Sequence, residues 1–241
     1  MLEGLGILAN SEYNNTGDLL GLGEIDNELM GYLNALDPVT RFKTISKLAK
    51  KPTASKGSRA EMEKFFNELP AHIKQGLLHG KLRLADSLIY TIKPISASKT
   101  IKMFETQDVK QVGLRNISNG RLPKNTALLV SGIVLLQGVS KSQNADDVMS
   151  TSWDVIDGVG ALSTGEFTLK ANKKQILDST SNYVFRTTGF NQVTKGYYKL
   201  ANPRLIQDDV DVEWEIDLGS ITGLDPNAFL FGGLHGTATI P

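Results

Sequence analysis

The spacing of hydrophobic and polar residues changes near residue 95. In the segment 210–218 apolar side chains alternate with Asp and Glu at every second position. Such strict alternation is typical of a β-strand with one buried face. The run 127–139 is apolar almost without interruption, which indicates a strand covered on both faces. Its second cover is expected to come from the N-terminal helices or from another subunit.

Short strand-like segments follow one another after residue 95, separated by clusters of Gly, Asn, Asp, Ser and Pro. About eight antiparallel strands with long, uneven connections favour a sandwich of two sheets, and a jelly roll is the leading interpretation. The predicted fold class is therefore mainly β, a jelly-roll-like antiparallel sandwich over residues 95–241 with an N-terminal helical or extended arm. The predicted strands are 100–106, 111–116, 127–139, 166–172, 182–187, 196–201, 210–218 and 228–239.

A helical segment, 58–94, is predicted to pack on this β domain. Ser58 and Glu61 have the spacing of a capping box. The following apolar residues recur on one helical face until Pro70, and 71–79 predicts a second short helix closed by Gly80. For 82–92 the pattern leaves helix and strand open. The apolar residues of the first helix are Met62, Phe65, Phe66, Leu69 and Ile73.

Charge separates the N-terminal arm, 1–57, from the rest of the chain. The protein has 241 residues, with 26 Lys and Arg against 26 Asp and Glu. Residues 1–40 contain seven acids and no Lys or Arg, and residues 41–59 contain seven bases and no acid. Frequent Gly and Asn among the first 23 residues indicate a flexible arm that orders against a neighbour. The bases are Arg41, Lys43, Lys47, Lys50, Lys51, Lys56 and Arg59.

These seven bases are the candidate contact for nucleic acid or lipid headgroups. If all seven met single-stranded nucleic acid, log affinity would fall against log salt with a slope of about −5. Anionic lipid would be attracted by about 1 kcal/mol for each charge. A solvated linker, or one paired with the acidic arm of the same or an adjacent chain, remains the alternative.

Catalytic and metal-binding motifs are not found in the sequence. The chain has no Cys, which excludes disulfides, iron–sulfur clusters and a Cys nucleophile. His72, His79 and His235 lack metal-ligand spacing, and the first two are expected near a helix C-terminus or on the surface. The acids of 210–218 are interpreted as a solvated outer face, balanced by Lys170 or Lys199 on other strands. We therefore expect no catalytic residue, no metal, no cofactor and no enzymatic activity.

Targeting signals are not expected either. Residues 1–10 have no basic start and no sustained apolar run, so a secretory signal is not predicted. The apolar run 127–136 is far shorter than the roughly 20 residues that a spanning helix needs, and Ser131 and Gly132 interrupt it. It is interpreted as a core strand.

The segments 101–104, 116–139, 200–206 and 232–233, placed after a helical and flexible arm, carry a diffuse family resemblance. In this combination the chain resembles the jelly-roll capsid proteins of tailless icosahedral bacteriophages, of the lipid-containing or small single-stranded DNA type. Major capsid proteins of membrane-containing phages often carry two jelly rolls, whereas this chain has room for one. The resemblance implies a single-jelly-roll capsid or vertex protein.

The expected function is thus that of a structural virion protein that builds an icosahedral shell by self-association. Its expected partners are other copies of itself, other virion proteins, and packaged nucleic acid or an internal membrane, with no small-molecule substrate. It would be made in the host cytoplasm and reside in the virion. The alternative is a carbohydrate- or ligand-binding jelly roll, such as a receptor-binding or decoration protein, using Trp153 and Tyr197 or Tyr198. Trp214 falls on the buried side of its strand and is not a candidate.

Overall fold

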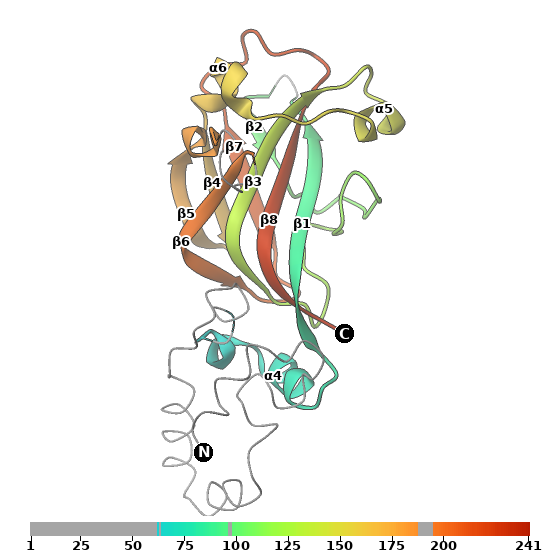
Figure 1. Ribbon diagram of the computed structural model, residues 1–241, viewed down its shortest axis with the longest axis vertical. Helices are drawn as coiled ribbons and strands as arrows, with labels where there is room; N and C mark the ends of the chain where they lie inside the picture. The colour runs from blue at the N-terminus through green and yellow to red at the C-terminus, as the bar shows by residue number, and fades with distance from the viewer. Residues whose placement is uncertain (1–61, 63, 96–97, 188–194) are drawn as a thin grey trace, which may run out of the picture. The chain divides into compact units, whose positions relative to one another are not determined.

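Residues 62, 64–95, 98–187 and 195–241 are described by a computed structural model of the chain (Figure 1). The predicted arm 1–57, Ser58 and Glu61 lie outside these residues. The described chain forms two compact units. One contains the described residues up to Asp86 with Asn125–Leu129 and Thr237–Pro241, and the other contains Ser87–Lys124 and Val130–Gly236 within the described ranges.

Eight strands form two four-stranded sheets with the orders β1-β8-β3-β6 and β2-β7-β4-β5. The first strand pairs with the last and the third with the sixth in one sheet, and the second pairs with the seventh and the fourth with the fifth in the other. This pairing arises when one long antiparallel ribbon rolls up, and it defines a jelly roll. The predicted fold class is confirmed. The strands are β1 (Arg83–Pro94), β2 (Thr100–Lys102), β3 (Leu128–Val139), β4 (Glu166–Ala171), β5 (Lys174–Ser181), β6 (Tyr197–Ile206), β7 (Val212–Asp217) and β8 (Ala228–Ile240).

Short helices occupy the first unit and the connections between strands. The first unit contains η3 (Phe66–Glu68) and α4 (Ala71–Leu78), and the second contains α5 (Ala145–Met149), η4 (Ile156–Gly158), α6 (Gly160–Ser163) and η5 (Asn182–Phe185). Helix α4 buries Ile73 and Leu77. It ends as predicted, because Gly80 adopts a φ of 67° and the His79 ring nitrogen Nδ1 lies 2.6 Å from the Gln75 carbonyl oxygen.

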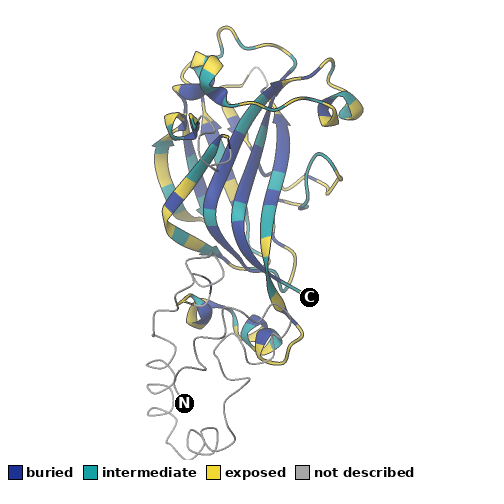
Figure 2. Ribbon diagram, in the orientation of Figure 1, coloured by how far each residue is buried: buried dark blue, intermediate teal, exposed yellow. Residues whose placement is uncertain are grey.

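Aromatic and aliphatic side chains fill the core of the second unit. Trp214 and Phe167 are fully buried, and Phe167 packs on Phe185 with ring centroids 5.0 Å apart. Strand β7 follows the predicted alternation, with Val212, Trp214 and Ile216 inside. Figure 2 shows β3 and β8 buried along most of their length.

The acids of β7 form an outer sheet face, as predicted. Glu213 lies opposite Lys170 on β4, and Lys102 on β2 pairs with Glu215 at 3.7 Å. Lys199 was the other proposed partner, but it lies on β6 in the other sheet. The carboxylates are therefore balanced by cross-strand lysines of their own sheet.

Three sequence predictions are wrong at the level of elements. Residues 111–116 form only isolated bridges, such as Gln111 with Arg115, and 182–187 contains η5 in place of a strand. Strand β5 was missed because its side chains are mostly exposed and show no regular alternation. The choice between helix and strand that the pattern left open for 82–92 is resolved as strand β1, so the strands begin near residue 83 and not near residue 95.

The second cover of β3 also differs from the prediction at its C-terminal end. A Cβ atom added to Gly138 would lie 2.6 Å from Thr151 Cγ2 and 3.1 Å from Trp153 Cε3, and Gln137 bridges with Asp154. The segment 151–154 of the same unit therefore covers this end of the strand. The expected cover by N-terminal helices or another subunit is not needed there.

Candidate interaction surface

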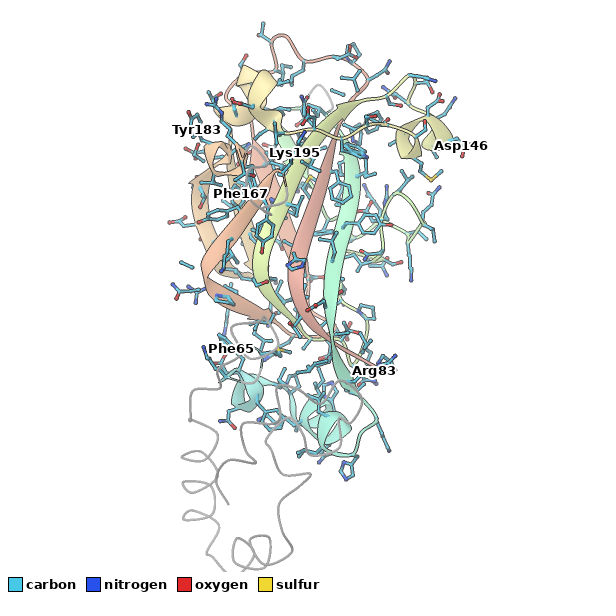
Figure 3. All side chains as sticks on the ribbon, in the orientation of Figure 1. Phe65, Arg83, Asp146, Phe167, Tyr183 and Lys195 are labelled. Carbon is cyan, nitrogen blue, oxygen red and sulfur yellow. The ribbon has the colours of Figure 1, made fainter. Side chains whose placement is uncertain are left out.

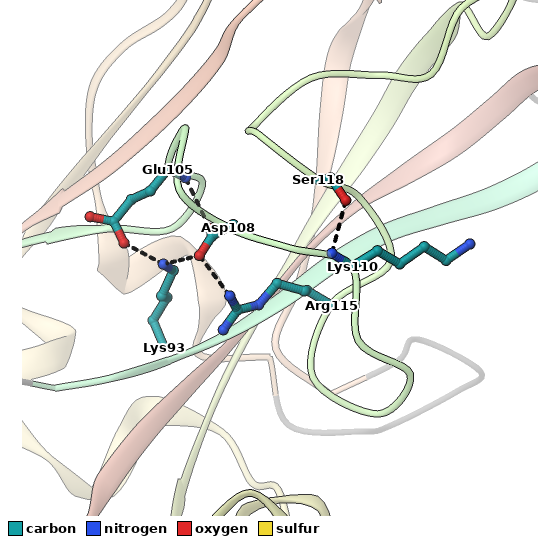
Figure 4. Close-up of polar contacts among 6 residues, drawn as sticks. All are labelled: Lys93, Glu105, Asp108, Lys110, Arg115 and Ser118. Atoms are coloured by element: carbon teal, nitrogen blue, oxygen red, sulfur yellow. Dashed lines mark hydrogen bonds and ion pairs between the residues drawn. The ribbon is translucent and has the colours of Figure 1, made fainter.

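A buried group of charges lies beneath the connection between β2 and β3, here called the 105–122 loop (Figure 4). Lys93 near the end of β1 donates to Asp108 Oδ1 at 2.8 Å and also pairs with Glu105. Arg115 donates to the same Asp108 oxygen at 2.7 Å, and the Glu105 amide donates to Oδ2 at 3.0 Å. Two cations thus face two carboxylates inside the loop.

The centre of this group is nearly closed to water, since Lys93 is 7% exposed and Asp108 is 5% exposed, whereas Glu105 and Arg115 are partly exposed. Buried charges are tolerated only when they are paired and hydrogen-bonded, and any movement that separates them leaves a charge without compensation. Both oxygens of Asp108 are occupied. The pairs therefore hold the 105–122 loop in one conformation.

The same loop covers the edge of β1. The Asn116 amide group accepts from the Tyr90 backbone N–H at 2.8 Å and donates to the Leu88 carbonyl at 2.7 Å. The Ile92 amide donates to the Leu114 carbonyl at 2.8 Å. An edge strand left open can pair with other chains, so these contacts block uncontrolled pairing along part of β1.

Two valines project from this fixed loop into solvent. Val109 is 69% exposed and Val112 is 83% exposed, and we call them the exposed valines. Next to them, Met149 on α5 is 39% exposed, and a Cβ atom at Gly113 would lie 2.5 Å from its sulfur. Large apolar side chains that are held rigidly in water are typical of a surface that binds a partner.

An apolar pocket with a volume of about 210 Å³ adjoins the exposed valines. Its inner wall includes Ile92, Val148 and Phe229, which form a buried cluster with Leu114, Trp153 and Phe231 packed against it. The pocket is lined by Ile92, Pro94, Leu114, Arg115, Gln143, Ala145, Val148 and Phe229. Val112 lies near this pocket, because Leu114 lines the pocket and Gly113 lies against Met149, the residue after the pocket residue Val148.

A second, polar cleft of about 490 Å³ lies between the 105–122 loop and Asp209. Lys110, Arg121 and Lys124 line it, beside a tight turn in which Asn119 and Gly120 have φ of 57° and 61°. Arg121 donates to Asp211 at 2.6 Å, and this hydrogen bond raises the pKa of the guanidinium. The central cation of the cleft is already paired, which weakens it as an anion site.

The aromatic residues of the alternative ligand-binding interpretation belong to separate clusters. Trp153 packs on Phe231 with ring centroids 5.8 Å apart, whereas Tyr198 packs edge-on against Phe167 at 6.5 Å. Tyr197 contacts the His235 ring at 5.8 Å, and burial raises the pKa of its phenol. The described residues do not show these three rings lining one pocket.

The predicted basic contact residues lie outside the described part of the chain, so the structure says nothing of Arg41, Lys43, Lys47, Lys50, Lys51, Lys56 and Arg59. Among the described residues, no group of three or more His, Asp or Glu is arranged to hold a metal ion. None of the helices in the described ranges has both the length and the apolar character needed to cross a membrane.

Sequence reasoning missed the exposed valines because 111–116 was interpreted as a strand. The available signal was a pair of valines three positions apart in the otherwise polar stretch 105–112. Comparison with known proteins adds no identification: no family model matches the chain, and neither does any curated protein sequence.

Proposed function

We propose that this protein is a structural subunit that works by self-association, as a major capsid or vertex protein of an icosahedral virion. The observation that carries the proposal is the pair of exposed valines, which belong to a loop held by ion pairs and lie close in sequence to the pocket residue Leu114. Exposing apolar side chains in a fixed position favours binding, because little conformational freedom is lost when a partner covers them.

The fold is compatible with this role but does not select it. Jelly rolls build viral capsids, and they also build lectins and cupins, so architecture alone is an analogy. A cupin-type metal site has no support among the described residues. A net charge of zero also removes long-range repulsion between identical copies.

The proposed partners are neighbouring copies and other virion proteins. The seven bases of 41–59 are proposed to meet packaged nucleic acid or an internal membrane, or the acidic residues of an adjacent chain. The proposal places the protein in the virion, with the described jelly roll forming the shell.

The test is the mass of the full-length protein across concentration and salt, by size exclusion with light scattering and negative-stain imaging of large species. Trimers, pentamers, hexamers or closed shells are expected. Val112→Ser should weaken association, because it removes apolar surface from the contact. Val139→Ser is the matched control, since Val139 is 55% exposed at the end of β3 and is not among the residues that line the pocket. A 26.2 kDa monomer under all conditions would contradict the proposal.

A further inference from the structure

We propose that the exposed valines and the apolar pocket form a reciprocal two-fold contact, in which Val112 of each copy enters the pocket of the other. This inference rests on the proposed function and names the surface that performs it. The partner is a second copy of this chain. The contact would make a closed pair of copies, and in a larger assembly it would join two neighbouring oligomers across a two-fold axis.

The closeness of Val112 to the pocket is the observation that supports a two-fold contact. In a two-fold interface the same patch serves both subunits, so the patch must contain both complementary parts of the contact. Val112 lies two residues from Leu114, which lines the pocket, and Gly113 between them contacts Met149 beside the pocket residue Val148. The projecting Val112 side chain and the pocket that would receive it in the other copy therefore lie close together on the surface of one copy.

The chemistry of the pocket fits a branched aliphatic side chain. The Ile92, Val148 and Phe229 side chains form an apolar wall, which needs no hydrogen-bonding partner, and the polar residues Arg115 and Gln143 complete the lining. A volume of about 210 Å³ leaves room for a valine. Among the large apolar side chains of the described residues, Val112 has the highest exposed fraction, 83%. The proposed contact would remove this side chain from water.

Charges around the patch are complementary between two copies. Lys110 lies between the two exposed valines in sequence, and Asp146 follows the pocket residue Ala145 on α5 (Figure 3). Both are exposed, and within the described ranges neither side chain forms an ion pair. Lys110 also lines the polar cleft, and in the proposed contact it pairs with Asp146 of the second copy, a pair that the symmetry repeats.

Cysteine cross-linking tests this geometry cleanly, because the chain has no Cys of its own. Val112→Cys is combined with Gln143→Cys, which replaces a residue of the pocket lining. On mild oxidation of the full chain with oxidised glutathione, we expect covalent dimers on a non-reducing gel. A ladder of larger covalent species would indicate head-to-tail contacts and would overturn the two-fold arrangement.

Two controls make the result specific. Mixing the two single variants should give the mixed dimer, whereas Val139→Cys mixed with Gln143→Cys should give no more product than random collision. Urea unfolding of each variant checks that these surface substitutions leave the fold intact. If the full chain forms oligomers but Val112→Cys and Gln143→Cys do not cross-link, the inference fails while self-association stands. If the chain is monomeric throughout, both fail.

Charge reversal provides an independent readout. Lys110→Glu and Asp146→Lys should each weaken dimerisation several-fold at low salt, and the combined variant should recover most of the loss. Sedimentation at low and high salt measures the effect. Failure of the combined variant to recover would contradict the proposed pairing of Lys110 with Asp146.

Discussion

The ion pairs between Lys93 and the 105–122 loop illustrate why a buried ion pair stabilises a conformation more than it stabilises the protein. Transfer of Lys93 and Asp108 from water costs several kcal/mol for each ion, and their attraction returns about the same amount. Once they are buried, however, removing one partner leaves the other uncompensated. The group therefore penalises every conformation of the loop except the observed one.

Lys93→Met should lower the free energy of unfolding by about 3–5 kcal/mol, because Asp108 then retains only Arg115 as a cationic partner in a buried site. Urea denaturation measures the change. Lys102→Met is the matched control, because that lysine is 59% exposed and its pair with Glu215 is 3.7 Å long. It should cost under about 1 kcal/mol. Equal losses in the two variants would show that the buried group does not restrain the loop.

Individual residues were predictable from sequence where one local pattern decides their position. The inward side of Trp214 follows from alternation in its own strand, and the capping position of His79 follows from the end of its own helix. The burial of Lys93 could not be predicted from its own strand, because its partner Asp108 lies 15 residues away in a loop. Gly132 is required because a Cβ atom would lie 2.1 Å from the Tyr197 hydroxyl, a contact between different strands that no local pattern contains.

At the scale of elements, prediction succeeded for strands that bury one face or both faces. Strands β3, β7 and β8 carry strong apolar patterns and were found within one or two residues of their ends. Strand β5 has few buried positions, so its pairing with β4 and not its own composition makes it a strand. The segment 111–116 has strand-like composition, but its backbone is used for bridges at the edge of β1.

The hydrogen-exchange protection of the β1 edge at Tyr90 should depend on the side chain of Asn116. Asn116→Ala removes the acceptor for the Tyr90 amide and the donor to the Leu88 carbonyl. We expect a loss of about 1–3 kcal/mol, since each hydrogen bond contributes roughly 0.5–1.5 kcal/mol. Hydrogen exchange should accelerate at the Tyr90 amide and stay unchanged at the Met103 amide, which donates to the Trp214 carbonyl in the other sheet. Unchanged protection at Tyr90 would show that the loop backbone alone covers the edge.

At the scale of the whole molecule, the rolled pairing of first strand with last was predictable only as a class of fold. Strand count, turn residues and one-sided burial favoured a two-sheet sandwich. The order within each sheet depends on contacts between strands more than a hundred residues apart, such as Ala127 with Thr239. The interaction surface depends on that order too, because the wall of its pocket combines Ile92 of β1, Phe229 of β8 and Val148 of α5.

The net charge of the chain is zero, but acidic and basic residues are segregated along it. The basic segment should therefore show salt-dependent binding to anionic partners. The seven bases of 41–59 are expected to bind single-stranded nucleic acid with a log–log salt slope of about −5, because each cation releases about 0.7 counterion. Fluorescence anisotropy of a labelled oligonucleotide with the full chain, across salt concentrations, measures this slope. Replacing all seven with Gln should abolish the dependence, whereas Lys124→Gln in the polar cleft should leave it unchanged. A slope near zero in the unsubstituted chain, together with salt-sensitive binding to anionic vesicles, would instead assign these bases to a lipid surface.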